Sequence, residues 1–401
     1  MFSVLDLFKR KPSRAALAKE VLHHLEKTKP GKGFTYNSAL QQITGDGAFI
    51  NLANVYHDYC RAARADRAAL LATFVRSLTE QNLPDTLAEA RARMLPVMRH
   101  MGGLECAQIS LGSEAPEADL YATYCIRPFS SHLGVGIAYD TADSVQQVGA
   151  KVLENWATTF DDVLAIALDN LRHKAAPKFE EFAPGLFVSQ FNDFYDATRI
   201  LLPEVAWQLP IKGQPVAMIP SRISLLICGD QDEVALGAMV DTAQRVIDSE
   251  SRVLGTEMFR LDDKVWRAWQ PPGQLGKRLQ ALQMQSLAAD YQAQQEALRA
   301  DLESKGQDIF VATFSLMQRE HEAISSYCAL TKGVNTWIPQ TDSLVLVDLE
   351  TEEQLVVAWA AFSEIATELL EKLPYLLPRY RVIDHPNDTQ LARFRQLAMV
   401  T

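Results

Sequence analysis

A pattern that occurs twice in the sequence places the strongest constraint on the fold. Ile219–Leu236 aligns without gaps with Ile338–Leu355, 119 residues later, and Leu186–Val188 has a counterpart in Ile309–Val311. Each copy places apolar runs before an acidic turn and then an amphipathic stretch, an order typical of strands followed by a helix. The repeat therefore predicts an α+β protein with duplicated modules of antiparallel strands followed by an amphipathic helix. A doubly wound parallel sheet fits less well.

A long helix is expected to join the two modules. The clearest linker is Gln270–Gln274, and the Gln-rich stretch after it continues to about Ser304 with leucines on one broad stripe. Such a helix acts either as a strut between domains or as a dimerising coiled coil. The heptad spacing is broken between Leu282 and Leu298, which favours the strut.

Shifts in composition and breaker residues divide the chain into five segments. They are a basic N-terminal segment (1–33), a hairpin with helices (34–110), an α+β domain (111–268), the connecting helix (269–305) and a C-terminal α+β module (306–401) that resembles 186–250.

Local patterns predict the elements within these segments. A hairpin is expected around Gly45–Gly47, because Asp-Gly supplies the positive φ that a tight turn requires. Helical spacing of apolar residues predicts helices elsewhere, and short apolar runs predict strands. The helices are expected at Ala53–Leu78, at a short segment ending in Met94–Arg99 and at Asp232–Glu250, and the strands at Leu120–Ile126, Leu133–Tyr139, Leu186–Gln190, Val216–Ile219 and Ser224–Cys228.

The charge balance excludes one large class of partner. The chain has 39 Lys and Arg against 50 Asp and Glu, a net charge of −11, and 48% of its residues are hydrophobic. Binding to nucleic acid depends on a basic surface that releases counterions, so no nucleic-acid partner is expected. An acidic surface suits a basic protein partner and speeds encounter with it.

The first 33 residues run against this trend, with eight Lys and Arg against three Asp and Glu. Phe2–Phe8 is largely apolar and stands just before Lys9–Lys11. Residues 1–11 could make a membrane-surface contact, but so few residues bury little apolar area. The alternative is a flexible start that leads into a docked helix.

The cysteines and apolar runs indicate a cytoplasmic protein. The five cysteines are odd in number, far apart and without a CxxC spacing, which predicts neither a disulfide framework nor a zinc knuckle. The longest apolar runs, Ile223–Cys228 and Leu355–Phe362, are far shorter than the roughly 20 residues that cross a bilayer.

No motif for metal, phosphate or nucleophilic chemistry is present in the sequence. The eight histidines show no HExxH or HxH spacing, so no metal site is expected. Gly134-Val-Gly136 lacks the rest of a Rossmann or P-loop signature, and no GxSxG elbow occurs. We therefore expect no cofactor and no assembled catalytic residues.

One polar cluster stands between apolar flanks and supplies the candidate ligand-binding or partner-binding residues. A guanidinium can hold an anion while a nearby carboxyl or phenol exchanges a proton. The alternative is a structural ion pair between Asp196 and Arg199 that fixes a turn. The candidates are Asp193, Tyr195, Asp196 and Arg199, together with Arg222 from the end of the neighbouring strand.

The same cluster carries a family resemblance. Asp193–Leu201 resembles the Asp-Gly-Tyr-Asp-Ala-Ser-Arg-Ile-Leu run of the YtpQ-like bacterial family, whose function is unknown. Similarity continues through Leu95–Arg99, Asp161–Arg172 and Val216–Ile227, so it covers about residues 15–250. Phe194 stands where the family often has Gly. The resemblance implies an α+β fold and a bacterial cytosolic protein but no reaction, and residues 270–401 have no counterpart in it.

Two functions follow from these observations as hypotheses. The first is a cytosolic protein-binding protein, such as an adaptor, an inhibitor or a chaperone-like partner, without its own catalysis. The duplicated module, the long helix and the lack of a catalytic motif favour it. The alternative is an enzyme that handles a small molecule or anion, with its site around Tyr195, Asp196 and Arg199.

Overall fold

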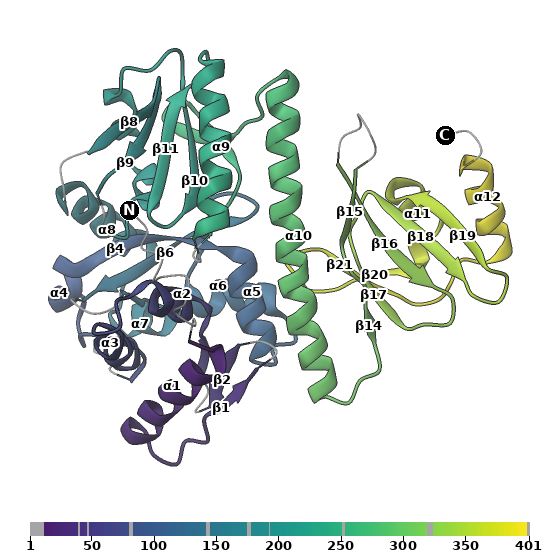
Figure 1. The fold of residues 1–401 in the computed structure, drawn as a ribbon, viewed down its shortest axis with the longest axis horizontal. Helices are drawn as coiled ribbons and strands as arrows, with labels where there is room; N and C mark the ends of the chain where they lie inside the picture. Colours follow the sequence, from purple (N-terminus) through teal and green to yellow (C-terminus); the bar gives the residue numbers. More distant parts are fainter. Residues whose placement is uncertain are drawn as a thin grey trace, which may run out of the picture. The chain divides into compact units, whose positions relative to one another are not determined.

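The computed structural model describes residues 12–38, 41–45, 48–79, 83–141, 145–174, 178–191, 193–250, 253–318 and 324–398 (Figure 1). Residues 1–11, for which a membrane-surface contact is predicted, lie outside these ranges. The chain divides into two compact units. The N-terminal unit comprises Met1–Met94 and Ala138–Gln147, and the C-terminal unit comprises Leu95–Ile137 and Val148–Thr401.

The N-terminal unit packs helices on a small antiparallel sheet of order β1-β2-β3. Its core includes Leu17, Ile43, Val55 and Leu71, all of them buried. The hairpin predicted near Gly45 is present as β2 and β3, although Asp46 and Gly47 themselves lie outside the described residues. The elements are α1 (Arg14–Thr28), β1 (Thr35–Asn37), β2 (Gln42–Gly45), β3 (Ala48–Asn51), α2 (Ala53–Arg61), α3 (Arg67–Thr79), α4 (Leu87–Ala90), a 3₁₀ turn (Arg91–Arg93) and β7 (Val145–Gln147).

The single helix predicted over Ala53–Leu78 was wrong in one respect, because α2 and α3 are separate helices. The chain leaves the helix at Ala62, which is extended with φ −65° and ψ 143°. Arg67 Nε donates to the Ala62 carbonyl at 3.3 Å, which satisfies a backbone acceptor at the break.

The C-terminal unit begins with a small sheet and helices. Here β4 (Met94–His100), β6 (Leu133–Asp140) and β5 (Arg127–Pro128) lie in the order β4-β6-β5. The end of β6 (138–140) belongs to the N-terminal unit and pairs there with β7. Two predictions were wrong in this region: Met94–Arg99 is a strand, and Leu120–Ile126 is mostly helix. Pro116 in the first turn and the nearby Glu117 and Asp119 favour a helix start, and the helix buries Leu120. The helices are α5 (Met101–Ser110), α6 (Pro116–Tyr124), α7 (Ala150–Asn155) and α8 (Phe160–Lys174).

A six-stranded antiparallel sheet of order β13-β12-β10-β11-β9-β8 follows. Helix α9 (Glu233–Ser249), capped by Asp232, covers one face, and its Met239 packs with Leu226 and Val216 of the sheet. Leu279 of the long helix α10 (Gly273–Ser304) completes this core (Figure 1). The strands are β8 (Phe179–Ala183), β9 (Leu186–Ser189), β10 (Pro215–Ser221), β11 (Ser224–Gly229), β12 (Met258–Asp262) and β13 (Val265–Ala268).

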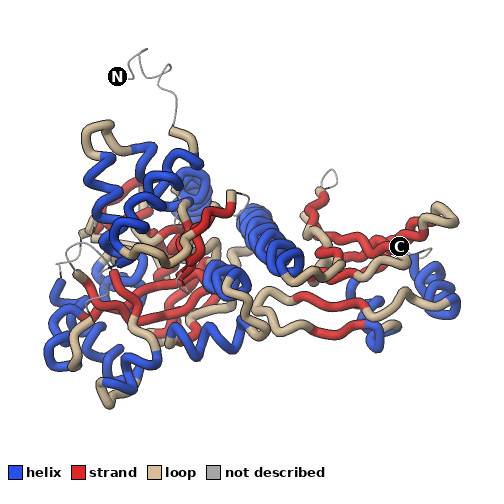
Figure 2. The backbone as a smooth tube through the Cα atoms, turned by 90° about the horizontal axis from the view of Figure 1, so that it is seen from below, coloured by secondary structure: helices blue, strands red, loops and turns tan. Residues whose placement is uncertain are grey.

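The chain beyond α10 forms two four-stranded sheets, β14-β17-β21-β20 and β15-β16-β18-β19. Figure 2 shows them as separate groups of strands on the C-terminal side of α10. Their shared core includes Leu330, Ile338, Leu344, Phe362 and Phe394. The elements are β14 (Phe310–Val311), β15 (Ser315–Met317), β16 (Ser325–Thr331), β17 (Thr336–Pro339), β18 (Ser343–Asp348), β19 (Glu353–Ala358), α11 (Trp359–Ile365), a 3₁₀ turn (Thr367–Leu369), β20 (Leu370–Lys372), β21 (Arg379–Val382) and α12 (Asp388–Ala398).

The structure confirms the α+β class and contains the long helix, but it does not confirm the duplication. In the first copy β10 and β11 form a hairpin that leads into α9. In the second copy β17 and β18 lie in different sheets, and the acidic turn leads into another strand, β19. Alternating burial along Glu353–Ala358 is typical of a strand, so the two segments share a residue pattern and not a module.

A buried polar network joins α5, α10 and the chain around β21. The fully buried Arg379 side chain donates to Gln294 Oε1 at 2.6 Å, to the Ala312 carbonyl at 3.0 Å and to the Tyr291 carbonyl at 3.4 Å. Gln294 Nε2 in turn donates to Glu105 Oε2 at 2.9 Å. This network ties the C-terminal sheets to α5 and α10.

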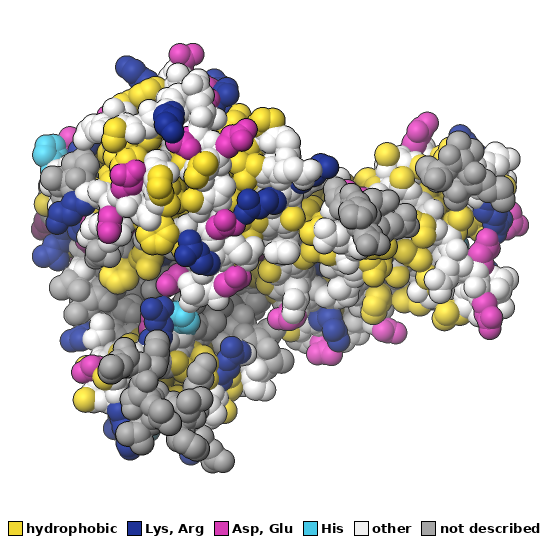
Figure 3. Space-filling view, turned by 45° about the horizontal axis from the view of Figure 1, so that its top comes forward, with side chains coloured by type: hydrophobic (Ala, Val, Ile, Leu, Met, Phe, Trp, Pro, Cys, Tyr) yellow, Lys and Arg dark blue, Asp and Glu magenta, His cyan; other side chains and the backbone are white. Residues whose placement is uncertain are grey.

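The surface shows both signs of charge. On the face in Figure 3, acidic and basic side chains are interspersed among the described atoms. Among the described residues, no helix combines the length and apolar character that crossing a membrane requires.

Candidate functional site

The predicted cluster at 193–199 is centred on an ion pair between the buried Arg199 and the partly exposed Asp193. Arg199 lies in the 3₁₀ helix η3 (Ala197–Leu201) and is 1% exposed. Its Nη1 and Nη2 donate to Asp193 Oδ1 and Oδ2 at 2.9 and 2.7 Å, and its guanidinium stacks 3.6 Å from the centre of the Phe191 ring. Burial alone raises the pKa of Asp193, but the hydrogen bonds and charge of Arg199 outweigh it and hold that pKa below its usual value. The pair is well placed to fix this turn.

The ion pair uses Asp193, and not Asp196 as the sequence pattern suggests. Phe194 adopts the left-handed conformation with φ 66°, which turns the chain so that Asp193 faces Arg199. The tight turn is therefore present although Phe194 stands at the position where the YtpQ-like pattern has Gly. Asp196 is 1% exposed; its Oδ1 accepts from the Phe191 amide at 3.1 Å, and its Oδ2 has no hydrogen-bond partner in the described part of the chain.

Tyr195 and Arg222 lie near a second arginine, Arg99 of β4. Burial, together with the charge of Arg222, lowers the pKa of Arg99 to about 9, while Tyr195 acts in the opposite direction. The Arg222 carbonyl accepts from the Ala197 amide at 3.3 Å, and Lys174 Nζ lies 5.3 Å from the centre of the Tyr195 ring. The structure thus brings all five predicted residues into one region. Their role in binding stays a prediction.

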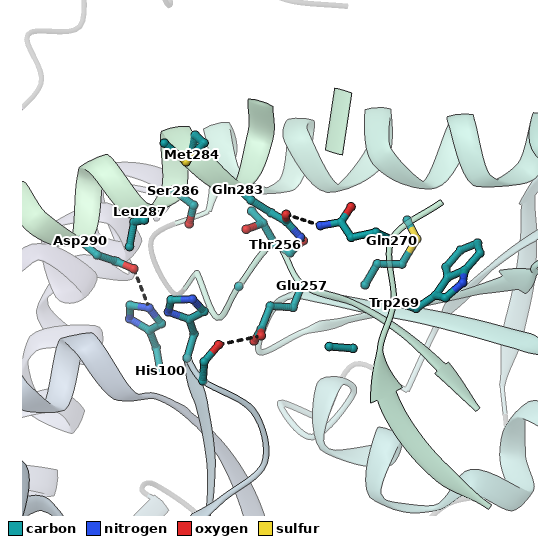
Figure 4. A pocket seen from close by; sticks show the side chains of 15 residues that line it. His100, Thr256, Glu257, Trp269, Gln270, Gln283, Met284, Ser286, Leu287 and Asp290 are labelled. Carbon is teal, nitrogen blue, oxygen red and sulfur yellow. Dashed lines mark hydrogen bonds and ion pairs between the residues drawn. The ribbon is translucent and has the colours of Figure 1, made fainter. Parts of the chain in front are cut away.

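A pocket of about 340 Å³ lies between α10, the start of β12 and the end of β13 (Figure 4). All of its walls belong to the C-terminal unit. Sequence reasoning missed it. Its lining residues are His100, Ser131, His132, Gly255, Thr256, Glu257, Met258, Ala268, Trp269, Gln270, Gln283, Met284, Ser286, Leu287 and Asp290.

His100 and Asp290 form a hydrogen-bonded pair at one end of the pocket. His100 caps the N-terminus of α5: its Nδ1 accepts from the Gly103 amide at 3.3 Å. The proton therefore resides on Nε2, which lies 3.1 Å from Asp290 Oδ2 and donates to it. Burial alone lowers the pKa of His100, but the hydrogen bond and charge of Asp290 dominate and raise it. Both ring nitrogens are engaged, so His100 has no free nitrogen to act as a general base.

Glu257 supplies the second carboxylate. It accepts hydrogen bonds from the hydroxyl groups of Ser130 and Ser131, the latter at 3.1 Å from Oε1. On the opposite side, Gln270 Nε2 donates to Gln283 Oε1 at 2.6 Å. Figure 4 shows these polar groups on the side of α10 toward which Ser286 and Leu287 point, and Met284 also lines the space. The pocket combines apolar walls with a few oriented polar groups, as sites for small molecules do.

The local sequence gives little sign of this site. His100 and Asp290 are separated by 190 residues, and no spacing rule connects them. The available signal is the position of Asp290 beside Leu287 and Tyr291 on the apolar stripe of α10, where a carboxylate needs a partner. No group of three or more His, Cys, Asp and Glu side chains in the described ranges could hold a metal ion.

Comparisons with protein-family models, curated proteins and solved structures found no match for the chain. Membership of the YtpQ-like family stays a prediction. The function is therefore inferred from the geometry of the site alone.

Proposed function

We propose that this protein binds a small organic molecule in the pocket beside α10. The observation that supports this function is the lining, in which Met258, Met284 and Leu287 surround a space that also exposes Glu257 and Asp290. Apolar walls supply affinity, and a small number of polar groups supply orientation. Both nitrogens of His100 are engaged, so this side chain helps to shape the wall of the pocket, whereas Glu257 and His132 also line the space.

Filling the pocket tests this function. The Ser286→Trp variant places an indole in the space, whereas Gln285→Trp adds the same group at an exposed position on α10. In a thermal-shift screen with a library of small organic molecules, the parent and Gln285→Trp are expected to share ligands that raise Tm. Ser286→Trp should lose those shifts, because ligand binding stabilises only a protein that can hold the ligand. Equal shifts in Ser286→Trp, or no ligand for the parent, would contradict the function.

A second candidate function, binding of a basic protein, is favoured by a surface on the C-terminal sheets. Grooves of about 580 and 290 Å³ lie on either side of Gly333–Asn335. Phe310, Val334 and Ile383 line them and are 55%, 42% and 61% exposed. Apolar side chains gathered in this way mark interaction surfaces, and the net charge of −11 suits a basic partner. We place this partner in the cytoplasm, because all five cysteines are free thiols.

Recovery of partners from the native host tests this second function. The double variant Val334→Glu with Ile383→Glu should lose a stoichiometric basic protein that the parent retains, because both substitutions put charge into the apolar surface. Leu349→Glu is the matched control, since Leu349 is 74% exposed in the turn between β18 and β19 and does not line the grooves. The same proteins recovered with all three chains would reject this surface as the binding site.

A further inference from the structure

The charges around the pocket beside α10 are unequal. Two carboxylates, Glu257 and Asp290, face it, while no Lys or Arg is among its described lining residues. Two histidines, His100 and His132, also line it, and His100 is hydrogen-bonded to Asp290. The pocket is therefore negatively charged, and a ligand that carries a positive charge balances it.

Glu257 carries the charge that the pocket leaves unbalanced. Its hydrogen-bond partners are the neutral hydroxyl groups of Ser130 and Ser131, which orient the carboxylate without neutralising it. In Figure 4, Glu257 lies across the pocket from α10. Asp290 lies toward one end of the pocket and Trp269 toward the other, with Glu257 between them. A carboxylate held in this way between apolar walls is placed to accept a charge-assisted hydrogen bond.

The remaining lining favours a carbon skeleton over a bare ion. Met258 is 1% exposed, and Met284, Leu287 and Trp269 also line the space. Methionine side chains adapt to irregular apolar shapes, and an aromatic ring tolerates a nearby cation. A hydrated inorganic cation would leave these contacts unused.

We propose that the pocket selects organic amines, with the ammonium group hydrogen-bonded to Glu257 and the carbon skeleton packed on Met284 and Leu287. This inference rests on the proposed ligand-binding function and names its ligand class. An amine is preferred over a neutral molecule of the same shape because only the amine offers a charged donor to Glu257.

Three probes of similar shape and different charge test the selection: phenethylamine, phenethyl alcohol and phenylacetate. Isothermal titration calorimetry at pH 7 is expected to give the tightest binding for the amine. Glu257→Gln should weaken amine binding at least about tenfold and leave the alcohol nearly unchanged. Glu364→Gln, at an exposed position far along the chain in α11, is the matched control and should bind all three probes as the parent does.

The outcomes separate the ligand class from the function itself. If the alcohol or phenylacetate binds the parent as tightly as the amine, or if Glu257→Gln keeps full amine affinity, the amine inference is wrong while ligand binding stands. If no probe binds and no library member loses its thermal shift in Ser286→Trp, the proposed function fails and the inference fails with it.

Discussion

Substitution of Arg379 by methionine is expected to lower the free energy of unfolding of the C-terminal sheets by about 3–5 kcal/mol. The side chain is fully buried, and burial lowers its pKa only to about 10, so it stays charged at neutral pH. Methionine fills similar space but donates no hydrogen bond. Gln294 Oε1 and the carbonyls of Ala312 and Tyr291 would then remain buried without their donor, which is costly for each group.

Amide hydrogen exchange measures this change locally, without assuming that the whole chain unfolds in one step. Protection of the amides in β17 and β21 should fall sharply in Arg379→Met. Arg381→Met is the matched control in the same strand, since that side chain is half exposed and lies 3.7 Å from Glu371 in a surface ion pair. An exposed pair of this kind contributes at most about 1 kcal/mol. Similar losses of protection in the two variants would rule out the buried network as the main link.

The network of Arg379 also shows where sequence reasoning ends. The stripe of leucines predicts α10 because helical periodicity is a local property. Gln294 is one of several glutamines in this helix, and nothing nearby in the sequence sets it apart. Its side chain is nevertheless hydrogen-bonded to Arg379, 85 positions later, and to Glu105, 189 positions earlier. Nothing in a single sequence distinguishes that buried amide from its exposed neighbours, because the contact exists only after the elements pack.

Short apolar runs gave the errors in secondary structure. Leu120–Ile126 and Met94–Arg99 have lengths that suit either a strand or a helical turn, so their assignment depends on flanking signals and on packing. The candidate cluster was located by its polar residues between apolar flanks. Its ion-pair partner was missed, because the φ of 66° at Phe194 that brings Asp193 to Arg199 is unusual for Phe.

Raising the pH from about 4.5 to about 7 is expected to lower the stability of the same region, by up to about 3 kcal/mol, through Glu105. This residue of α5 is fully buried, and burial raises its pKa to about 7. Hydrogen bonds from the Leu376 and Leu377 amides and from Gln294 oppose that rise without cancelling it. The folded state therefore holds the Glu105 proton more tightly than the unfolded state. Stability is highest at a pH below the pKa of Glu105 in the unfolded chain, and it declines until the pH passes the pKa of Glu105 in the folded protein.

Glu105→Gln isolates this contribution, because glutamine keeps the shape of the side chain and does not titrate. Between pH 4.5 and 7, amide protection in β21 should change less with pH in this variant than in the parent. This comparison of slopes holds even if the substitution raises or lowers the stability at every pH. Glu114→Gln, at an exposed position in the loop after α5, should keep the slope of the parent. The raised pKa of His100 also lowers stability as the pH rises, but this effect begins only near about pH 6.5 and continues above it. The difference between the parent and Glu105→Gln below pH 6 therefore belongs to Glu105, and an unchanged slope there would show that its carboxylate ionises in the folded protein as it does in water.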